Sequence, residues 1–213
     1  MVKLEDSDTV SWSRFYSYRI EIRNKYPSVY NLKIKKKLLD VIIAELKEGN
    51  KILDVGASSK SLGKKIISRF PSINYKTMDI DKNQPHDYYS LKEISESFDI
   101  IILSEVIEHL EFKEGISMLY NLLNLLNCGG KIIVSTPNIH HPNRYWWDPD
   151  HKTPYRYEGI GAALLSVGFR VDKIFRIYND QFLKRFFRIY MASFLHKYLD
   201  VDFAKSIVVV AQK

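Results

Sequence analysis

Residues 51–63 read KILDVGASSKSLG, and this stretch decides the fold. Lys51 to Val55 form the short apolar run that is typical of a buried parallel strand, and the residues from Ser61 onward predict a helix. The small residues between them therefore form a tight turn, in which Gly56 allows a sharp bend and Ser61 is the expected helix N-cap. Asp54 lies near the carboxyl end of the strand, which is where open α/β sheets bind their ligands.

The glycine content of this turn indicates which ligand to expect. It does not match the G-x-G-x-x-G fingerprint of dinucleotide-binding folds. Asp54-x-Gly56-x-Ser58-x-Lys60 instead resembles the first motif of class I S-adenosylmethionine (SAM) methyltransferases, which is written acid-x-Gly-x-Gly-x-Gly. Ser58 and Lys60 stand where that motif has its second and third glycines. A strand, turn and helix without any ligand is the alternative that this loop alone leaves open.

A second acidic residue supports a ligand that carries a nucleoside. Residues 73–78 predict a second strand, and this strand ends on Asp79. A carboxylate in this position, roughly two dozen residues after the first one, accepts hydrogen bonds from ribose hydroxyls in dinucleotide folds. Capping of the next turn is the alternative role for Asp79.

The rest of the chain alternates helices with strands. Apolar runs predict strands at residues 98–103, 131–138, 169–178 and 206–211, and a minimal third strand at residues 87–89. Helical periodicity is found at residues 32–46, 62–70, 115–126 and 159–167. This alternation predicts an α/β domain.

The order of the motifs makes the resemblance more specific. The strings DVGAS, MDID, FDIIILSEVIEHL, GGKIIVSTPN and DPDHKTPYR follow one another as in class I methyltransferases, over residues 31–178 and the last strand. The E-V-x-E-H string resembles ubiquinone-pathway and glycan O-methyltransferases, and also small-RNA 2′-O-methyltransferases. The resemblance implies an α/β, Rossmann-like seven-stranded methyltransferase sheet of order 3-2-1-4-5-7-6, with an antiparallel last strand and helices on both faces.

The resemblance also implies SAM as the cofactor and an enzyme that transfers its methyl group. We expect O-methylation of a small-molecule, lipid-linked or glycan hydroxyl. An acid in the position of Asp87 would contact the adenine amino group. The full set of residues expected to bind the cofactor is Asp54, Gly56, Ala57, Ser58, Asp79, Ile80, Asp87 and Ser104.

Histidines and glutamates after the fourth strand are the candidates for catalysis. A hydroxyl acceptor must be aligned and must lose its proton, and His109 or His151 is the expected helper, with Glu105 able to orient it. If residues 105–109 are helical, Glu105, Glu108 and His109 share one face. In the RNA-modifying relatives the matching residues bind a divalent ion, so Glu105, Glu108, His109 and His151 are the alternative metal ligands. A metal-free role is preferred; a bound ion would be magnesium or manganese.

The acceptor itself is left open by the sequence. Tyr145, Trp146 and Trp147 are expected either to stack on an acceptor or to pack as a hydrophobic flap. A metal-dependent RNA 3′-terminal 2′-O-methyltransferase is the alternative enzyme. A binding protein that has lost its cofactor is the non-enzymatic alternative, because Ser58 and Lys60 replace glycines.

Residues 1–213 are expected to form a single methyltransferase domain. Within it, residues 1–30 are predicted to be a helical lid, and residues 179–204 a basic amphipathic insertion before the last strand. Residues 182–199 could cover the acceptor pocket, contact an anionic membrane surface or form a dimer face.

Composition sets the remaining bounds. The net charge of +7 suits an anionic partner, but a small-molecule or glycan acceptor is preferred over nucleic acid. Cys128, the single cysteine, excludes an internal disulfide and fits a reducing compartment. No apolar run approaches the roughly 18 residues of a spanning helix, and no signal peptide is recognisable at the start. We therefore expect a cytoplasmic protein, with peripheral attachment to a membrane as the alternative.

Overall fold

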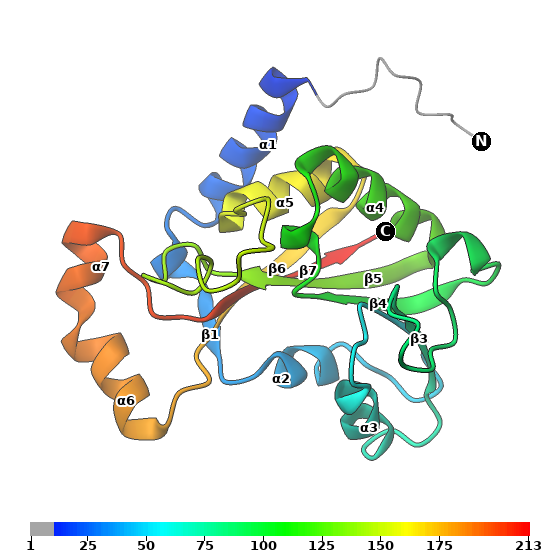
Figure 1. The fold of residues 1–213 in the computed structure, drawn as a ribbon. Helices are drawn as coiled ribbons and strands as arrows, with labels where there is room; N and C mark the ends of the chain where they lie inside the picture. Colours follow the sequence, from blue (N-terminus) through cyan, green and yellow to red (C-terminus); the bar gives the residue numbers. More distant parts are fainter. Residues whose placement is uncertain (1–10) are drawn as a thin grey trace.

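The computed structural model describes residues 11–213, which are organised around a seven-stranded sheet (Figure 1). The strands are β1 (Lys33–Lys35), β2 (Lys51–Val55), β3 (Asn74–Met78), β4 (Phe98–Ser104), β5 (Leu126–Pro137), β6 (Arg170–Ile177) and β7 (Ser206–Gln212). The α-helices are α1 (Trp12–Lys25), α2 (Leu38–Ile43), α3 (Ser61–Ile67), α4 (Phe112–Leu125), α5 (Tyr157–Ser166), α6 (Phe182–Phe186) and α7 (Ser193–Leu199). Short 3-10 turns lie at Val29–Asn31, Leu91–Glu93 and Ile107–His109, and a π-helical turn at Phe187–Met191 joins α6 to α7.

The sheet order is β1-β6-β7-β5-β4-β2-β3. The last strand, β7, is antiparallel to both β5 and β6, and the other pairs are parallel. These features confirm the predicted methyltransferase sheet. The predicted third strand is reduced to one isolated bridge, between Met78 and Tyr88, beside β3.

The prediction of one helix over residues 32–46 was wrong. Residues 33–35 form β1, which pairs with the outer edge of β6, and only Leu38–Ile43 are helical. Pairing with β6 satisfies backbone groups that an open sheet edge would leave exposed, and this long-range gain outweighs the local helical pattern.

Each face of the sheet is covered by its own set of helices (Figure 1). Leu53 and Ile101 point to the face covered by α1, α4 and α5, whereas Ile52, Ile100 and Ile102 point to the face covered by α2 and α3. All of them are at most 3% exposed. Burial on both faces explains why these strands read as continuous apolar runs in the sequence.

The carboxyl ends of the parallel strands β2, β3, β4 and β5 share one edge of the sheet, so the loops that follow them meet there. The insertion at 179–204 holds α6, the π-helical turn and α7, and it stands beyond the sheet on the side to which the β5 arrow points (Figure 1). No helix within residues 11–213 combines the length and the apolar character needed to cross a bilayer.

The predicted N-terminal lid lies outside the described residues at positions 1–10. The rest of it contains α1, which packs against α5: Ile22 is 2% exposed, and Arg19 and Arg23 both donate to the buried Glu158. At the start of α1, the Trp12 ring stacks on Phe112, three residues after His109. Helix α1 therefore borders the segment that follows β4.

Candidate functional site

The turn between β2 and α3 keeps a glycine-like backbone. Gly56 has a φ of 74°, and its N–H donates to the Met78 carbonyl at 2.8 Å. A Cβ at this position would overlap the Val106 side chain, so only glycine fits. Ser58 and Lys60, at the second and third glycine positions of the motif, have φ values of 42° and 55°. The backbone conformation that glycine favours is therefore retained where glycine itself is not.

Helix α3 begins differently from the prediction. The N-cap is Lys60 in a left-handed conformation, and Ser61 is the first helical residue, so the prediction of Ser61 as the cap was wrong. The sharp turn needs a left-handed residue directly before the helix, and this requirement outweighs the capping preference of serine.

Asp79 lies against this turn. Its Oδ2 accepts from the Ser58 N–H at 2.9 Å, and its Oδ1 accepts from the Asp81 N–H at 3.0 Å. Each carboxylate oxygen can accept a further hydrogen bond, because it has two lone pairs. The next residue, Ile80, is 81% exposed and places an apolar side chain beside the carboxylate.

Asp54 is a buried acid at the same edge of the sheet. The Tyr75 hydroxyl donates to its Oδ2 at 2.5 Å. Burial raises the pKa of Asp54 to about 6, the Tyr75 hydrogen bond opposes this, and the negative charge of Asp79 adds to it. The two carboxylates are thus electrostatically coupled.

Three other predicted cofactor ligands already take part in internal contacts. Asp87 accepts from the Thr77 N–H and hydroxyl, both at 2.9 Å, and pairs with Lys76 at 3.0 Å. This ties the segment with the isolated bridge to β3, and an adenine contact for Asp87 stays a prediction. Ser104 Oγ lies 3.0 Å from Ser135 Oγ, and Ala57 is buried with its N–H directed to the Met78 carbonyl.

A second group of functional side chains follows β4 and β5. Glu108, His109 and His151 each offer a ligand atom, and these atoms lie within 4.8 Å of one another. The His109 and His151 rings are 4.8 Å apart between centroids. The loop that carries His151 is held by the Glu108 carbonyl, which accepts from the Lys152 and Thr153 N–H groups at 2.8 and 3.0 Å. We call these three residues the histidine cluster.

The hydrogen bond of His151 fixes its tautomer. Nδ1 lies 2.6 Å from the Tyr145 carbonyl oxygen. A carbonyl oxygen can only accept, so Nδ1 carries the proton and donates. In the neutral ring Nε2 is then left as a proton acceptor.

Glu108 is a fully buried carboxyl group within this cluster. It is 0% exposed, and neither carboxylate oxygen has a hydrogen-bond partner among the described residues. Burial and the nearby negative charge of Glu105 raise the pKa of Glu108 to about 8, against smaller opposing effects of its own backbone N–H, the Thr136 hydroxyl and the Arg144 charge. The surroundings of Glu108 therefore favour its protonated form.

Glu105 is directed elsewhere. It accepts from the Ser135 hydroxyl at 3.0 Å and pairs with Arg144 at 3.2 Å. The helical geometry considered for residues 105–109 was wrong: Glu105 has a φ of 53°, and only Ile107–His109 form a short 3-10 turn. Glu105 is therefore not among the three residues whose ligand atoms the structure brings together.

The aromatic residues after β5 divide into two groups. Tyr145 is 5% exposed, whereas Trp146 and Trp147 are each 78% exposed. The two tryptophans are therefore not a packed flap. Sequence reasoning missed Tyr75, Arg144 and the Tyr145 carbonyl; the first two are polar residues near motif positions, but a backbone carbonyl gives no signal in a sequence.

A family profile described as "Methyltransferase domain" matches residues 27–174. The chain belongs to this methyltransferase family. It is a class I SAM-dependent methyltransferase, and the turn after β2, Asp79 and the histidine cluster all follow strands whose carboxyl ends share one edge of its sheet. None of the curated proteins matches the chain.

Solved structures show the same fold. A SAM-dependent methyltransferase from Archaeoglobus fulgidus superposes with a TM-score of 0.66 at 18% identity, over 92% of this chain and 100% of that one. The Mycobacterium tuberculosis cyclopropane synthase MmaA2 gives 0.58 at 12%, over 82% of each chain. A SAM-dependent methyltransferase from Mesorhizobium loti gives 0.57 at 15%, over 82% and 96%. At these identities the likeness shows the fold alone.

The residues of this methyltransferase suit the chemistry of SAM. The cofactor carries ribose hydroxyls, an adenine ring and an amino group. Asp54 and Asp79 supply carboxylate acceptors for hydroxyl and amino donors, and Ile80 supplies an exposed apolar side chain for a flat ring. Gly56 has no side chain to obstruct an approach to the backbone of the turn.

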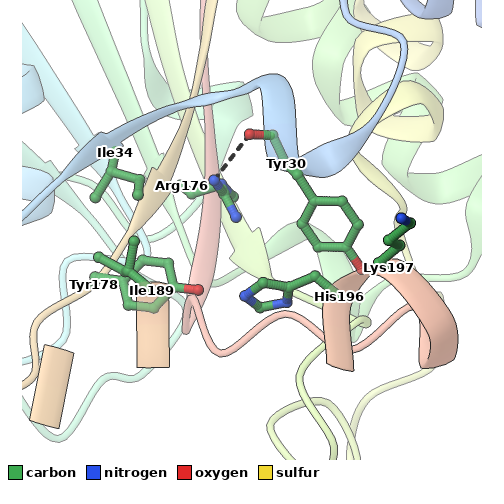
Figure 2. A pocket seen from close by; sticks show the side chains of 7 residues that line it. All are labelled: Tyr30, Ile34, Arg176, Tyr178, Ile189, His196 and Lys197. Atoms are coloured by element: carbon green, nitrogen blue, oxygen red, sulfur yellow. Dashed lines mark hydrogen bonds between the residues drawn. The ribbon is translucent and has the colours of Figure 1, made fainter. Parts of the chain in front are cut away.

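The methyltransferase also has a hollow of about 410 Å³ at the carboxyl end of β6, beside β1 (Figure 2). Tyr30, Arg176, Tyr178 and His196 line it, together with Ile34, Ile189 and Lys197. Arg176 donates to the Tyr30 carbonyl at 3.1 Å and pairs with the buried Asp202 at 2.9 Å. These partners occupy the Arg176 guanidinium, so Arg176 presents no unpaired charge to the hollow.

Proposed function

We propose that this methyltransferase transfers the SAM methyl group to a hydroxyl of a small-molecule, lipid-linked or glycan acceptor. The observation that carries the proposal is the hydrogen bond from His151 Nδ1 to the Tyr145 carbonyl. It leaves Nε2 as an acceptor in the neutral ring, which is what the removal of a hydroxyl proton needs.

Bound SAM supplies an electrophilic methyl group. His151 Nε2 takes the proton of the acceptor hydroxyl, while Nδ1 keeps its own proton and donates it in a hydrogen bond to the Tyr145 carbonyl. His109, whose ring lies 4.8 Å from that of His151, helps to orient the acceptor. Glu108 supplies a buried carboxyl group next to the ring that becomes an imidazolium, and Glu105 acts at a distance through its charge.

We assign the cofactor to the turn after β2 and to the acids beside it. Gly56, Ala57 and Ser58 form the wall of its site, and Asp79 accepts from the ribose hydroxyls. Asp54, Ile80, Asp87 and Ser104 complete the proposed set. The hydrogen bond between the Ser58 N–H and Asp79, at 2.9 Å, supports this assignment because it joins the two halves of the set.

The test uses methyl transfer from tritiated SAM to a panel of phenols, glycans and isoprenoid alcohols. His151→Asn is expected to lower kcat by about a hundredfold or more with the SAM dissociation constant unchanged, because general-base catalysis contributes about 10²–10⁴-fold. His140→Asn is the matched control, since His140 Nδ1 also lies against a backbone carbonyl, that of Asp200, but outside the histidine cluster. If the His151 variant keeps full activity on a hydroxyl acceptor that the wild type methylates, His151 is not the base.

The histidine cluster also favours a second candidate, a metal-dependent RNA 3′-terminal 2′-O-methyltransferase. Its three ligand atoms within 4.8 Å and the unpartnered Glu108 oxygens suit magnesium or manganese. This candidate predicts activity that a chelator abolishes and Mn²⁺ restores. It also predicts an affinity for short RNA that falls steeply with salt, since phosphate contacts release counterions. Chelator-resistant transfer to a small hydroxyl would exclude it.

A further inference from the structure

The insertion carries an apolar stripe that faces outward. Its members, which we call the outer stripe, are between 50% and 79% exposed: Phe182, Leu183, Phe186, Phe187, Tyr190, Met191, Phe194, Tyr198 and Leu199. Single exposed apolar residues are normal on a protein surface, whereas a contiguous set marks a site of interaction.

Neighbouring members of the stripe lie together along the insertion. Phe186 and Tyr190 are four residues apart with ring centroids 5.0 Å apart, and α7 exposes Phe194 and Tyr198 at the same spacing after the break at Ala192. These side chains all stay at least half exposed. An ordinary surface helix buries its apolar face, so the amphipathic pattern is reversed here.

The inner side of the insertion confirms the reversal. Arg188 points toward the protein, where it pairs with Asp180 at 2.8 Å and lies 4.9 Å from the centre of the Phe203 ring. His196 packs on Tyr30 with ring centroids 4.7 Å apart, at the rim of the hollow in Figure 2. These contacts hold the insertion with the outer stripe turned away from the protein.

We propose that the outer stripe docks this methyltransferase on the surface of an anionic lipid bilayer. Lys184, Arg185 and Lys197 flank the stripe, and none of them has an ion-pair partner among residues 11–213. Aromatic side chains with flanking cations are typical of helices that lie in the interfacial region of a bilayer.

Charge decides between a bilayer and a second copy of the chain. A symmetric dimer through the stripe would bring the same cations of both copies together, on chains that each carry a net charge of +7. An anionic surface meets these cations with the opposite charge. The insertion that carries the stripe lies on the side of the molecule to which the β5 arrow points, as does the segment 138–156 that follows β5 (Figure 1). Docking would therefore bring the site close to acceptors in a membrane, but it does not depend on which acceptor is used.

The test is co-sedimentation of the full chain with vesicles of phosphatidylcholine, alone or mixed with phosphatidylglycerol. Binding is expected to the mixed vesicles and to be weak on phosphatidylcholine alone. Lys184→Gln/Lys197→Gln is expected to weaken partitioning by about thirtyfold, because two interfacial cations are removed. Phe182→Ser/Phe187→Ser is expected to abolish it.

Tyr16→Ser is the matched control for the aromatic variants. Tyr16 is 57% exposed on α1, close to the 60% of Phe187, and it lies outside the stripe. This variant should bind vesicles as the wild type does. Circular dichroism melts identify any variant that fails to fold, and the charge variant then decides the outcome alone.

Equal binding to both vesicle types, or unchanged binding by either stripe variant, would overturn the proposal. A second result would also overturn it: the wild type does not bind vesicles but forms a dimer in light scattering, and Phe182→Ser/Phe187→Ser dissociates that dimer. This result would assign the stripe to contact with a second copy of the chain.

Discussion

Replacing Ser58 or Lys60 with glycine is expected to stabilise this methyltransferase. Both residues have a left-handed backbone, with φ values of 42° and 55°, in a turn whose family motif has glycine at these positions. Neither side chain forms a hydrogen bond or ion pair with the rest of residues 11–213, so its removal forfeits little.

The magnitude follows from two opposing terms. A left-handed conformation costs a residue with a Cβ about 1–2 kcal/mol. Glycine relieves that strain but loses about 0.5–1 kcal/mol through the greater freedom of its unfolded chain. Each replacement should therefore raise the free energy of unfolding by about 0.5–1 kcal/mol.

The assay is urea unfolding followed by circular dichroism, with Ser59→Gly as the control. Ser59 lies between the two positions but is not among the residues with positive φ. Its replacement should lower the free energy of unfolding by about 0.5–1 kcal/mol, because only the entropic loss applies. If Ser58→Gly and Lys60→Gly destabilise the chain as Ser59→Gly does, the turn does not have the glycine-like backbone described here.

Two further perturbations test the site. Gly56→Ala should lower the free energy of unfolding by about 2–5 kcal/mol, from left-handed strain and from overlap with Val106, and adding Val106→Ala should recover the overlap part. Gly49→Ala, where φ is 77° and a Cβ would have nothing within 4 Å, should show the strain alone; an equal loss at both glycines would contradict the overlap. Asp54 has a folded pKa of about 6, raised from 3.8, so it holds its proton more tightly when folded; its contribution to stability is present in acid and is lost as the pH rises through about 6. Between pH 3.8 and about pH 6, urea unfolding should show a loss of about 3 kcal/mol in the free energy of unfolding that Asp54→Asn removes. An identical pH profile in both proteins would refute the raised pKa.

Much of this fold could be predicted because parallel strands leave a strong local signal. Residues 51–55 and 98–103 are covered on both faces and therefore read as largely apolar runs, and an acid close to each strand end, Asp54 and Glu105, marks the shared edge. The position of Asp79 against the turn at Gly56 could be predicted from its spacing after the first strand and from the resemblance.

The remainder depends on contacts that lie far apart in the sequence. Residues 33–35 become a strand only because β6 offers them an open edge. The left-handed backbone at Glu105 directs its side chain away from the histidine cluster. No residue in the E-V-x-E-H string predicts this backbone conformation. Helical periodicity predicted the amphipathic insertion, but periodicity does not say which face is turned outward.

The central claim is that the turn at Gly56 and the carboxylate of Asp79 together hold SAM. Isothermal titration calorimetry of the folded chain tests it most directly. We expect the wild type to bind SAM, Asp79→Ala to bind about ten- to a hundredfold more weakly, because hydrogen bonds to a charged group contribute about 1.5–3 kcal/mol, and Asp81→Ala to bind as the wild type does. A wild-type chain that is folded and gives no heat with SAM, or an Asp79 variant with undiminished affinity, would contradict the account.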